Sequence, residues 1–179
     1  MFYECSALKS IYTDDGMLFS NTINATEMFA GCFNLSYEGS YWECLTCGKR
    51  MFNKCSKLES IQINSFRNLE DGTEMFQGCI SLKSCYWSLP SLQNGTRMFA
   101  EAAIQDINFY ANDSSAEEGW DKLTNATEMF RNSYITIFNG SLPSCTDCGG
   151  MFENSRICTC YSFSGSDCNL SIPLCEYGG

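Results

Sequence analysis

The sequence predicts an α/β repeat solenoid, a right-handed coil of about seven turns with a short parallel strand and a short helical turn in each repeat. The main observation is the dipeptide Met-Phe, which occurs seven times in 179 residues. The repeats begin at Met1, Met28, Met51, Met75, Met98, Met129 and Met151. Such a period is typical of stacked units that bury their apolar faces against their neighbours. We therefore treat residues 1–179 as a single repeat domain.

Apolar residues recur at similar distances from each Met, which is the second observation, although repeats five to seven are one residue shorter before the isoleucine. The fifth position is cysteine in four repeats (Cys5, Cys32, Cys55 and Cys79), and we expect these small side chains to form a buried core ladder of free thiols. A leucine or isoleucine row follows at Leu8, Leu35, Leu58, Leu82, Ile104, Ile135 and Ile157. We expect a second inward column at Ile61, Cys85, Ile107, Phe138 and Cys160.

Local composition assigns the elements within a repeat. The segments SIQI, INFY and ITIF are rich in β-branched and aromatic residues, which favours a short strand. The Met-Phe segment is often preceded by Thr-Glu, and Gly31 and Gly78 lie near its end, which favours one or two helical or 3₁₀ turns. Successive strands stacked in register predict a parallel sheet along one side of the coil.

These residues resemble the BspA-like leucine-rich repeats of bacterial and protist surface proteins. The best matching stretch is LESIQINSFRNLEDGTEMFQGCISL, from Leu58 to Leu82, and MFAGCFNL from Met28 is almost as similar. The match weakens after Met98, where Ala102, Ser133 and Ser155 replace the fifth-position cysteine. The resemblance implies a leucine-rich-repeat-like fold displayed outside the cell, in a family associated with adhesion, and it implies no catalytic residues.

Composition limits the function. The net charge of −10 argues against nucleic acid or an anionic membrane as a partner, because both require a basic face. No run of 18 apolar residues predicts a membrane span, and no secretory signal precedes the first repeat. The chain has no histidine, the commonest general base and metal ligand, and no paired carboxylates or phosphate loop stand out. We expect no enzyme activity, no cofactor and no metal.

The remaining cysteines lie in connecting segments or in the last repeats. An oxidising compartment favours disulfides among Cys44, Cys47, Cys145, Cys148, Cys158, Cys160, Cys168 and Cys175. Two pairs form CxxC motifs, Cys44–Cys47 and Cys145–Cys148. A structural disulfide is the favoured interpretation. Four-cysteine zinc binding is disfavoured because the pairs are about four coils apart, roughly 20 Å. A bridge between Cys145 and Cys175 competes with local pairing, and connectivity stays open.

Seven Asn-x-Ser/Thr sequons predict N-glycosylation at Asn24, Asn34, Asn94, Asn112, Asn125, Asn139 and Asn169. Three of them (Asn24, Asn94 and Asn125) lie four residues before a Met-Phe, where Asp71 and Cys47 occupy the same phase. For those three, the alternative is a ladder whose side chains accept hydrogen bonds from backbone amides at a turn. Covalent N-glycans are the only non-protein groups that we expect.

The ends of the chain, one loop and the aromatic residues raise further possibilities. Gly178-Gly179 followed by Met1-Phe2 would repeat the boundary at Gly149-Gly150-Met151-Phe152, which predicts a segment of a longer array or a protomer that stacks head to tail. The acidic insertion from Ala111 to Lys122 is expected to be solvated rather than a calcium site, because it lacks an EF-hand ligand pattern. Aromatic residues occur just past the predicted strands. We expect them either to line a surface that binds a ligand or to face the core.

Two functions follow. The first is a non-enzymatic extracellular structural protein, glycosylated and disulfide-stapled, that forms a fibre or surface coat from copies of itself joined end to end. The second is an ectodomain that acts as an adhesin or ligand-binding module for a host or matrix protein or glycan. Both place the chain outside the cell or at its surface, without nucleic-acid binding or membrane insertion.

Overall fold

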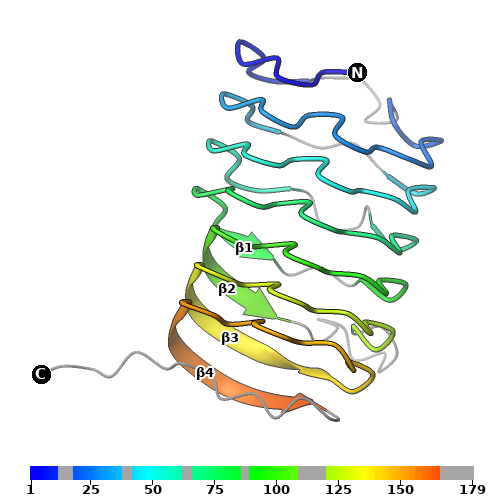
Figure 1. Cartoon of the computed structure of the whole chain (residues 1–179). Helices are drawn as coiled ribbons and strands as arrows, with labels where there is room; N and C mark the ends of the chain where they lie inside the picture. Colours follow the sequence, from blue (N-terminus) through cyan, green and yellow to red (C-terminus); the bar gives the residue numbers. More distant parts are fainter. Residues whose placement is uncertain (12–17, 38–41, 62–65, 86–88, 109–119, 166–179) are drawn as a thin grey trace, which may run out of the picture.

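The computed structural model describes residues 1–11, 18–37, 42–61, 66–85, 89–108 and 120–165. Successive Met-Phe segments lie one above the next along a single stack, from the N-terminal repeat to β4 (Figure 1). Isolated parallel bridges join neighbouring repeats at the position four residues before each Met: Asn24, Cys47, Asp71, Asn94, Asn125 and Asp147. These bridges fix the register of the stack from the second repeat to the seventh.

A four-stranded parallel sheet lies on one side of the later repeats, in the order β1-β2-β3-β4. Its strands are β1 (Ser84–Cys85), β2 (Ala103–Asn108), β3 (Tyr134–Leu142) and β4 (Arg156–Gly165). The register aligns Cys85 with Ile107, Ile107 with Phe138 and Phe138 with Cys160. The strands lengthen toward β4, and β-branched and aromatic residues are frequent in β3 and β4.

The predicted fold class is wrong. The residues that the structure describes contain no helix, and their four strands form one open parallel sheet in the later repeats rather than a strand in every repeat. The expected α/β solenoid with a leucine-rich-repeat-like helical turn is therefore not what this chain builds. The Met-Phe segments are consecutive β-turns instead.

Left-handed residues explain why these segments are turns. Glu27 has φ 56° and Gly31 has φ 75°, and each is the third residue of a four-residue turn. The first turn closes with Met28 N–H donating to Ala25 C=O at 3.0 Å, and the second with Cys32 N–H donating to Phe29 C=O at 3.0 Å. A left-handed residue every four positions is incompatible with a continuous right-handed helix. Met-Phe is thus the junction between two turns.

The backbone hydrogen bonds between repeats alternate with those that close the turns. Phe52 N–H donates to Met75 C=O at 2.9 Å, and Lys54 N–H donates to Gln77 C=O at 2.7 Å. Met51 N–H, one residue earlier, instead closes its own turn on Gly48 C=O. The turn segments therefore satisfy their backbone donors without forming a regular strand or helix.

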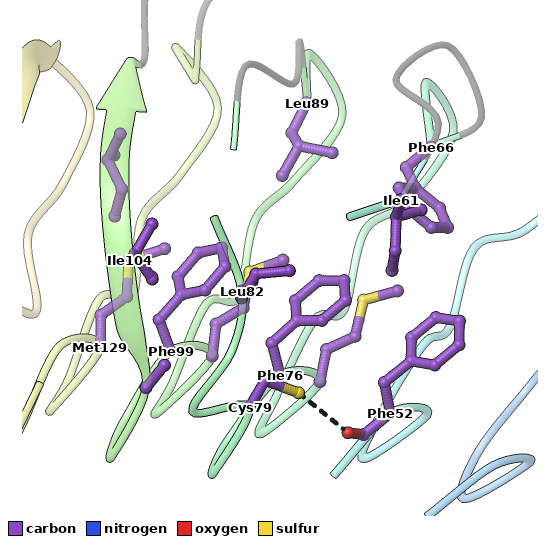
Figure 2. Close-up of a cluster of buried hydrophobic side chains, with 14 of the residues drawn as sticks. Phe52, Ile61, Phe66, Phe76, Cys79, Leu82, Leu89, Phe99, Ile104 and Met129 are labelled. Atoms are coloured by element: carbon purple, nitrogen blue, oxygen red, sulfur yellow. Dashed lines mark hydrogen bonds between the residues drawn. The ribbon is translucent and has the colours of Figure 1, made fainter. Parts of the chain in front are cut away.

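The core is built around one column of phenylalanine rings. Phe2, Phe29, Phe52, Phe76, Phe99, Phe130 and Phe152 stack in order, with neighbouring ring centroids 5.4 to 5.6 Å apart and planes within 13°. Figure 2 shows Phe52, Phe76 and Phe99 side by side in this column. Offset-stacked aromatic pairs stabilise beyond the burial of their area. The column gives every repeat the same core contact.

The predicted leucine and isoleucine row is buried from Leu35 to Ile157, and Leu8 in the first repeat is half-buried. In the second predicted column Ile61, Ile107 and Phe138 are buried, and Cys160 is half-buried. The predicted burial is therefore confirmed for most of the side chains described, but among the described residues the parallel sheet begins only at Ser84 and lies beside the later positions alone. What the pattern could not specify was the backbone that carries them.

Candidate functional site

The residue before each Met carries alternating charge along one side of the stack. We call Glu27, Arg50, Glu74, Arg97 and Glu128 the charged column; all five have left-handed backbones, with φ between 51° and 56°. Arg50 pairs with Glu27 at 2.7 Å and with Glu74 at 2.8 Å, in the repeats on either side. Longer ion pairs join Arg97 to Glu74 at 3.9 Å and to Glu128 at 3.5 Å. Opposite charges in adjacent repeats therefore reinforce the register of the bridges.

A second polar row lies beside the charged column. Arg131 pairs with Glu128 at 3.2 Å and with Glu153 at 3.3 Å. Asn53 donates to the side-chain carbonyl of Gln77 at 3.1 Å, and Gln77 donates to a carboxylate oxygen of Glu101 at 3.2 Å. The long polar side chains of this face are thus used to join neighbouring repeats.

The charged column borders a groove of about 650 Å³ near the N-terminal end. Tyr3, Glu27, Arg50 and Lys54 are among its lining residues. The Glu4 carboxylate beside Tyr3 is the main cause of a raised pKa for the tyrosine hydroxyl. Because acids and bases alternate along its floor, the groove presents no single sign of charge to a ligand.

We call the position four residues before each Met, where the isolated parallel bridges lie, the bridge phase. The three sequon asparagines at this position also lie in turns. The side-chain oxygen of Asn94 accepts from the Thr96 N–H at 3.1 Å and from the Thr96 hydroxyl at 2.7 Å. Asn24 makes the same two contacts with Thr26. Asn125 accepts from the Thr127 N–H at 3.0 Å and from the Thr96 hydroxyl of the preceding repeat at 3.1 Å.

Asp71 shows what this position requires. Its carboxylate accepts the Thr73 N–H at 2.9 Å, as the asparagines do for their threonines. Aspartate has the acceptor oxygen but lacks the amide nitrogen to which a sugar would be attached. The acceptor role at this phase is therefore independent of glycosylation, and the use of these asparagines as glycan sites stays a prediction.

The other sequons lie apart from the bridge phase. Asn34 is half-buried and donates its side-chain amide to Ser6 C=O at 2.8 Å. Asn139 is half-buried within β3. Asn112 and Asn169 lie outside the described residues, as does most of the acidic insertion between Ala111 and Lys122.

The fifth-position cysteines are free thiols that bond to the preceding repeat. The Sγ atoms of Cys32, Cys55 and Cys79 donate to the carbonyl oxygens of Phe2, Phe29 and Phe52 at 3.0, 3.2 and 3.2 Å. Figure 2 marks the bond from Cys79 to Phe52. Burial raises the pKa of the Cys55 thiol to about 12 and also raises the pKa of Cys32. Cys5, in the first repeat, is exposed.

The structure separates the disulfide candidates. Cys44, Cys47, Cys145, Cys158 and Cys160 are not disulfide-bonded. Cys148 is disulfide-bonded. Cys168 and Cys175 lie outside the described residues. The oxidation state of the two CxxC motifs in the mature protein stays a prediction.

Sequence reasoning missed the charged column. Its signal is present in the sequence, because the residue before Met-Phe reads Glu, Arg, Glu, Arg, Glu from the second repeat to the sixth. The alternation was not recognised because a helix was expected at Met-Phe. In a helix, charged residues near Met-Phe would be interpreted as part of a solvent-exposed face. Left-handed Glu and Arg are also uncommon, since glycine and asparagine are the usual residues at such backbone angles.

The described ranges hold neither a candidate metal site nor a candidate membrane-spanning helix. No group of three or more Cys, Asp or Glu side chains in the described ranges is arranged to hold a metal ion. Nor does that part of the chain contain a helix of the length and hydropathy that a membrane crossing requires.

Comparison with known proteins identifies a repeat family. The family model described as "Mycoplasma protein of unknown function, DUF285" matches residues 1–112 and again residues 46–159. The two matches overlap because a repetitive sequence fits the model in more than one register. They support a repeat family without singling out the BspA-like leucine-rich repeats. No curated protein and no solved structure matches the chain. Because this match spans more than half of the chain, the chain belongs to the family described as "Mycoplasma protein of unknown function, DUF285".

Proposed function

We propose that the chain is a non-enzymatic structural protein of the cell surface, whose repeats form a rod that stacks end to end with other copies. The observation that carries this proposal is the unbroken phenylalanine column from Phe2 to Phe152. A column with the same spacing at every step makes each repeat a structural equivalent of its neighbours. In a repeat protein of this kind, each repeat contacts only its neighbours. The protein becomes longer by the addition of repeats, and no single repeat forms a specialised pocket.

The chemistry of the charged column supports a structural role. Glu74 and Glu128 each contact an arginine of an adjacent repeat, so their carboxylates are neutralised by neighbours. A general acid or base instead needs a carboxylate or imidazole with a pKa near the working pH, and the chain has no histidine. The charged groups that border the groove are therefore better suited to holding neighbouring repeats together than to catalysis.

A surface location is supported by membership of this repeat family, by the resemblance to BspA-like surface proteins and by the seven sequons. We include N-glycans in the proposal, with the amide nitrogens of the bridge-phase asparagines as acceptors. Their side-chain oxygens are already engaged by the threonine two residues on, which leaves the amide nitrogen as the free end of the group.

End-to-end stacking would continue, between two copies, the backbone hydrogen bonds that join neighbouring repeats within one chain. In an interior repeat, Met75 C=O accepts from Phe52 N–H and Gln77 C=O accepts from Lys54 N–H. The equivalent carbonyls of the first repeat are those of Met1 and Tyr3. The seventh repeat of another copy has its equivalent donors at Phe152 and Asn154.

Negative-stain microscopy of the purified chain tests this proposal. We expect particles whose lengths are multiples of one chain length, with longer particles at higher protein concentration. Phe2→Asp places a charge on the open edge beside Phe29 and should leave particles of a single length. Leu18→Asp, at an exposed position away from the column, should leave the length distribution unchanged. Particles of one length for the unmodified chain would contradict stacking and favour an adhesive or ligand-binding module instead.

A further inference from the structure

A row of side chains on the outer surface alternates between bulky and small. The row contains the residue five positions after each Met, and we call it the outer ridge: Ser6, Phe33, Ser56, Ile80, Ala103, Tyr134 and Arg156. Repeats two, four and six carry Phe33, Ile80 and Tyr134, which are 47%, 61% and 46% exposed. Repeats one, three and five carry serine or alanine. Large exposed apolar side chains in a regular array indicate an interaction surface.

Contacts within the chain join these residues in two runs, from Ser6 to Ser56 and from Ala103 to Arg156, and Ile80 lines one groove together with Ala103 and Tyr134. The Ser56 hydroxyl donates to Phe33 C=O at 3.3 Å, and Asn34, beside Phe33, donates to Ser6 C=O. Ala103 is aligned with Tyr134, and Tyr134 with Arg156, in the parallel register of β2, β3 and β4. Because neighbouring strands lie about 4.8 Å apart, bulky side chains recur about every 10 Å along the ridge.

The space between Ile80 and Tyr134 is a hollow. A groove of about 400 Å³ lies over the sheet and is lined by Ile80, Ala103 and Tyr134. Its floor is the small side chain of the fifth repeat, between the bulky residues of the fourth and sixth. The side chains of Ile80 and Tyr134 are therefore separated by the width of one repeat. A single bulky side chain from another molecule would fill this space.

We propose that the outer ridge is the interface of an antiparallel homodimer. A two-fold axis between the third and fourth repeats pairs repeat one with six, two with five and three with four. Phe33 of one copy then lies over Ala103 of the other, Ile80 over Ser56, and Tyr134 over Ser6. Each bulky side chain meets a small one, and the symmetry repeats all three contacts. Such an isologous interface closes at two copies.

Charge favours the same arrangement. Glu59 in the third repeat and Lys83 in the fourth line the groove beside Ile80, and they form an ion pair within the chain. The two-fold axis places Glu59 of one copy opposite Lys83 of the other, so the four charges alternate across the interface. A parallel pair in register would instead put Phe33 on Phe33 and Glu59 on Glu59, and like charges directly opposite one another are unfavourable.

The test is sedimentation equilibrium of the chain made without N-glycans, since Asn34 neighbours Phe33 on the ridge. The Phe2→Asp chain, in which end-to-end stacking is blocked, provides the background and separates the two kinds of association. We expect a plateau at the mass of two chains. Ile80→Ser should raise the dimer dissociation constant by at least about tenfold, as loss of a central apolar anchor does. Ile23→Ser, a matched control at 63% exposure away from the ridge, should leave it unchanged.

Distances between spin labels on the two copies test the orientation. Labels at residue 56 lie close to the axis, whereas labels at residue 6 lie near opposite ends of the dimer. We therefore expect a short distance for residue 56 and a distance longer by about 20 Å, four further repeat steps, for residue 6. A monomer at every concentration, a dimer that Ile80→Ser leaves intact, or equal distances at the two positions would each overturn the proposal.

Discussion

The Sγ atom of Cys55 lies 3.2 Å from the carbonyl oxygen of Phe29, to which it donates a hydrogen bond across the boundary between two repeats. That carbonyl also accepts the Cys32 N–H that closes a turn of its own repeat. One small side chain thus fills the core and joins a turn to the repeat before it. Ser133 has a different contact at the same position, because its hydroxyl donates to Phe130 C=O within its own repeat at 2.6 Å.

The Cys55 thiol should make the protein sensitive to alkali. Burial raises its pKa from 9.0 to about 12, so between these values the unfolded chain loses a proton that the folded chain keeps. Stability from this group is complete below pH 9 and falls as the pH rises, by up to about 1.4 kcal/mol per pH unit. Urea unfolding at several alkaline pH values measures the slope. In Cys55→Ala the slope should be shallower, and an identical slope in both proteins would contradict the assignment.

Truncating the centre of the phenylalanine column should be severe. Phe76 is fully buried between Phe52 and Phe99, with ring centroids 5.6 Å away on each side. Phe76→Ala should therefore cost about 3–5 kcal/mol of unfolding free energy. Chemical denaturation followed by circular dichroism provides the measurement. The control is Ile23→Ala at an exposed position away from the outer ridge, which should change stability by less than about 0.5 kcal/mol.

Reversing one charge in the charged column should cost more than removing it. Arg50 is about half exposed, so Arg50→Ala should lose about 1 kcal/mol or less from its pairs with Glu27 and Glu74. Arg50→Glu places three carboxylates in consecutive repeats and should be less stable than Arg50→Ala at low salt. Thermal melts at low and high ionic strength compare the two variants. The difference should shrink as salt screens the repulsion, and a difference that salt leaves unchanged would contradict this origin.

Asn94 should be replaceable by aspartate but not by alanine. Its side-chain oxygen accepts two hydrogen bonds from Thr96, and Asp71 makes equivalent contacts with Thr73 one repeat earlier. Asn94→Ala should lose about 1 kcal/mol, as loss of a local side-chain acceptor at a turn does. Asn94→Asp should lose much less. Equal losses for the two variants in urea unfolding would show that the acceptor oxygen is unimportant.

The sequence was sufficient to predict which side chains are buried. Leu58 and Leu82 lie seven residues after Met and Ile104 lies six residues after it, and all three are buried in the stack. The turns at the bridge phase could also be predicted from the sequence. Asn24, Asp71 and Asn94 lie at the same distance before Met, and these residue types favour turns. Such patterns depend on periodicity, which a repetitive chain presents many times over.

The backbone of the Met-Phe segment was beyond the same reasoning. Thr-Glu-Met-Phe consists of residues that a helix accepts, yet Glu27 and Glu74 adopt left-handed angles. The hydrogen bonds that compensate this conformation come from the next repeat, for example Glu74 N–H to Thr96 C=O at 2.9 Å. Local propensity carries no information about a partner more than twenty residues away, so tertiary hydrogen bonding overrides it.

The central claim is that the Met-Phe segments are turns joined to the next repeat, and the scalar coupling across the hydrogen bond of Phe52 tests it most directly. In this structure the Phe52 amide nitrogen couples to the carbonyl carbon of Met75, because Phe52 N–H donates to Met75 C=O at 2.9 Å. In a helix the same N–H would donate to the residue four positions back, Gly48. We predict an observable coupling from Phe52 nitrogen to Met75 carbon. A coupling from Phe52 nitrogen to Gly48 carbon would contradict the account.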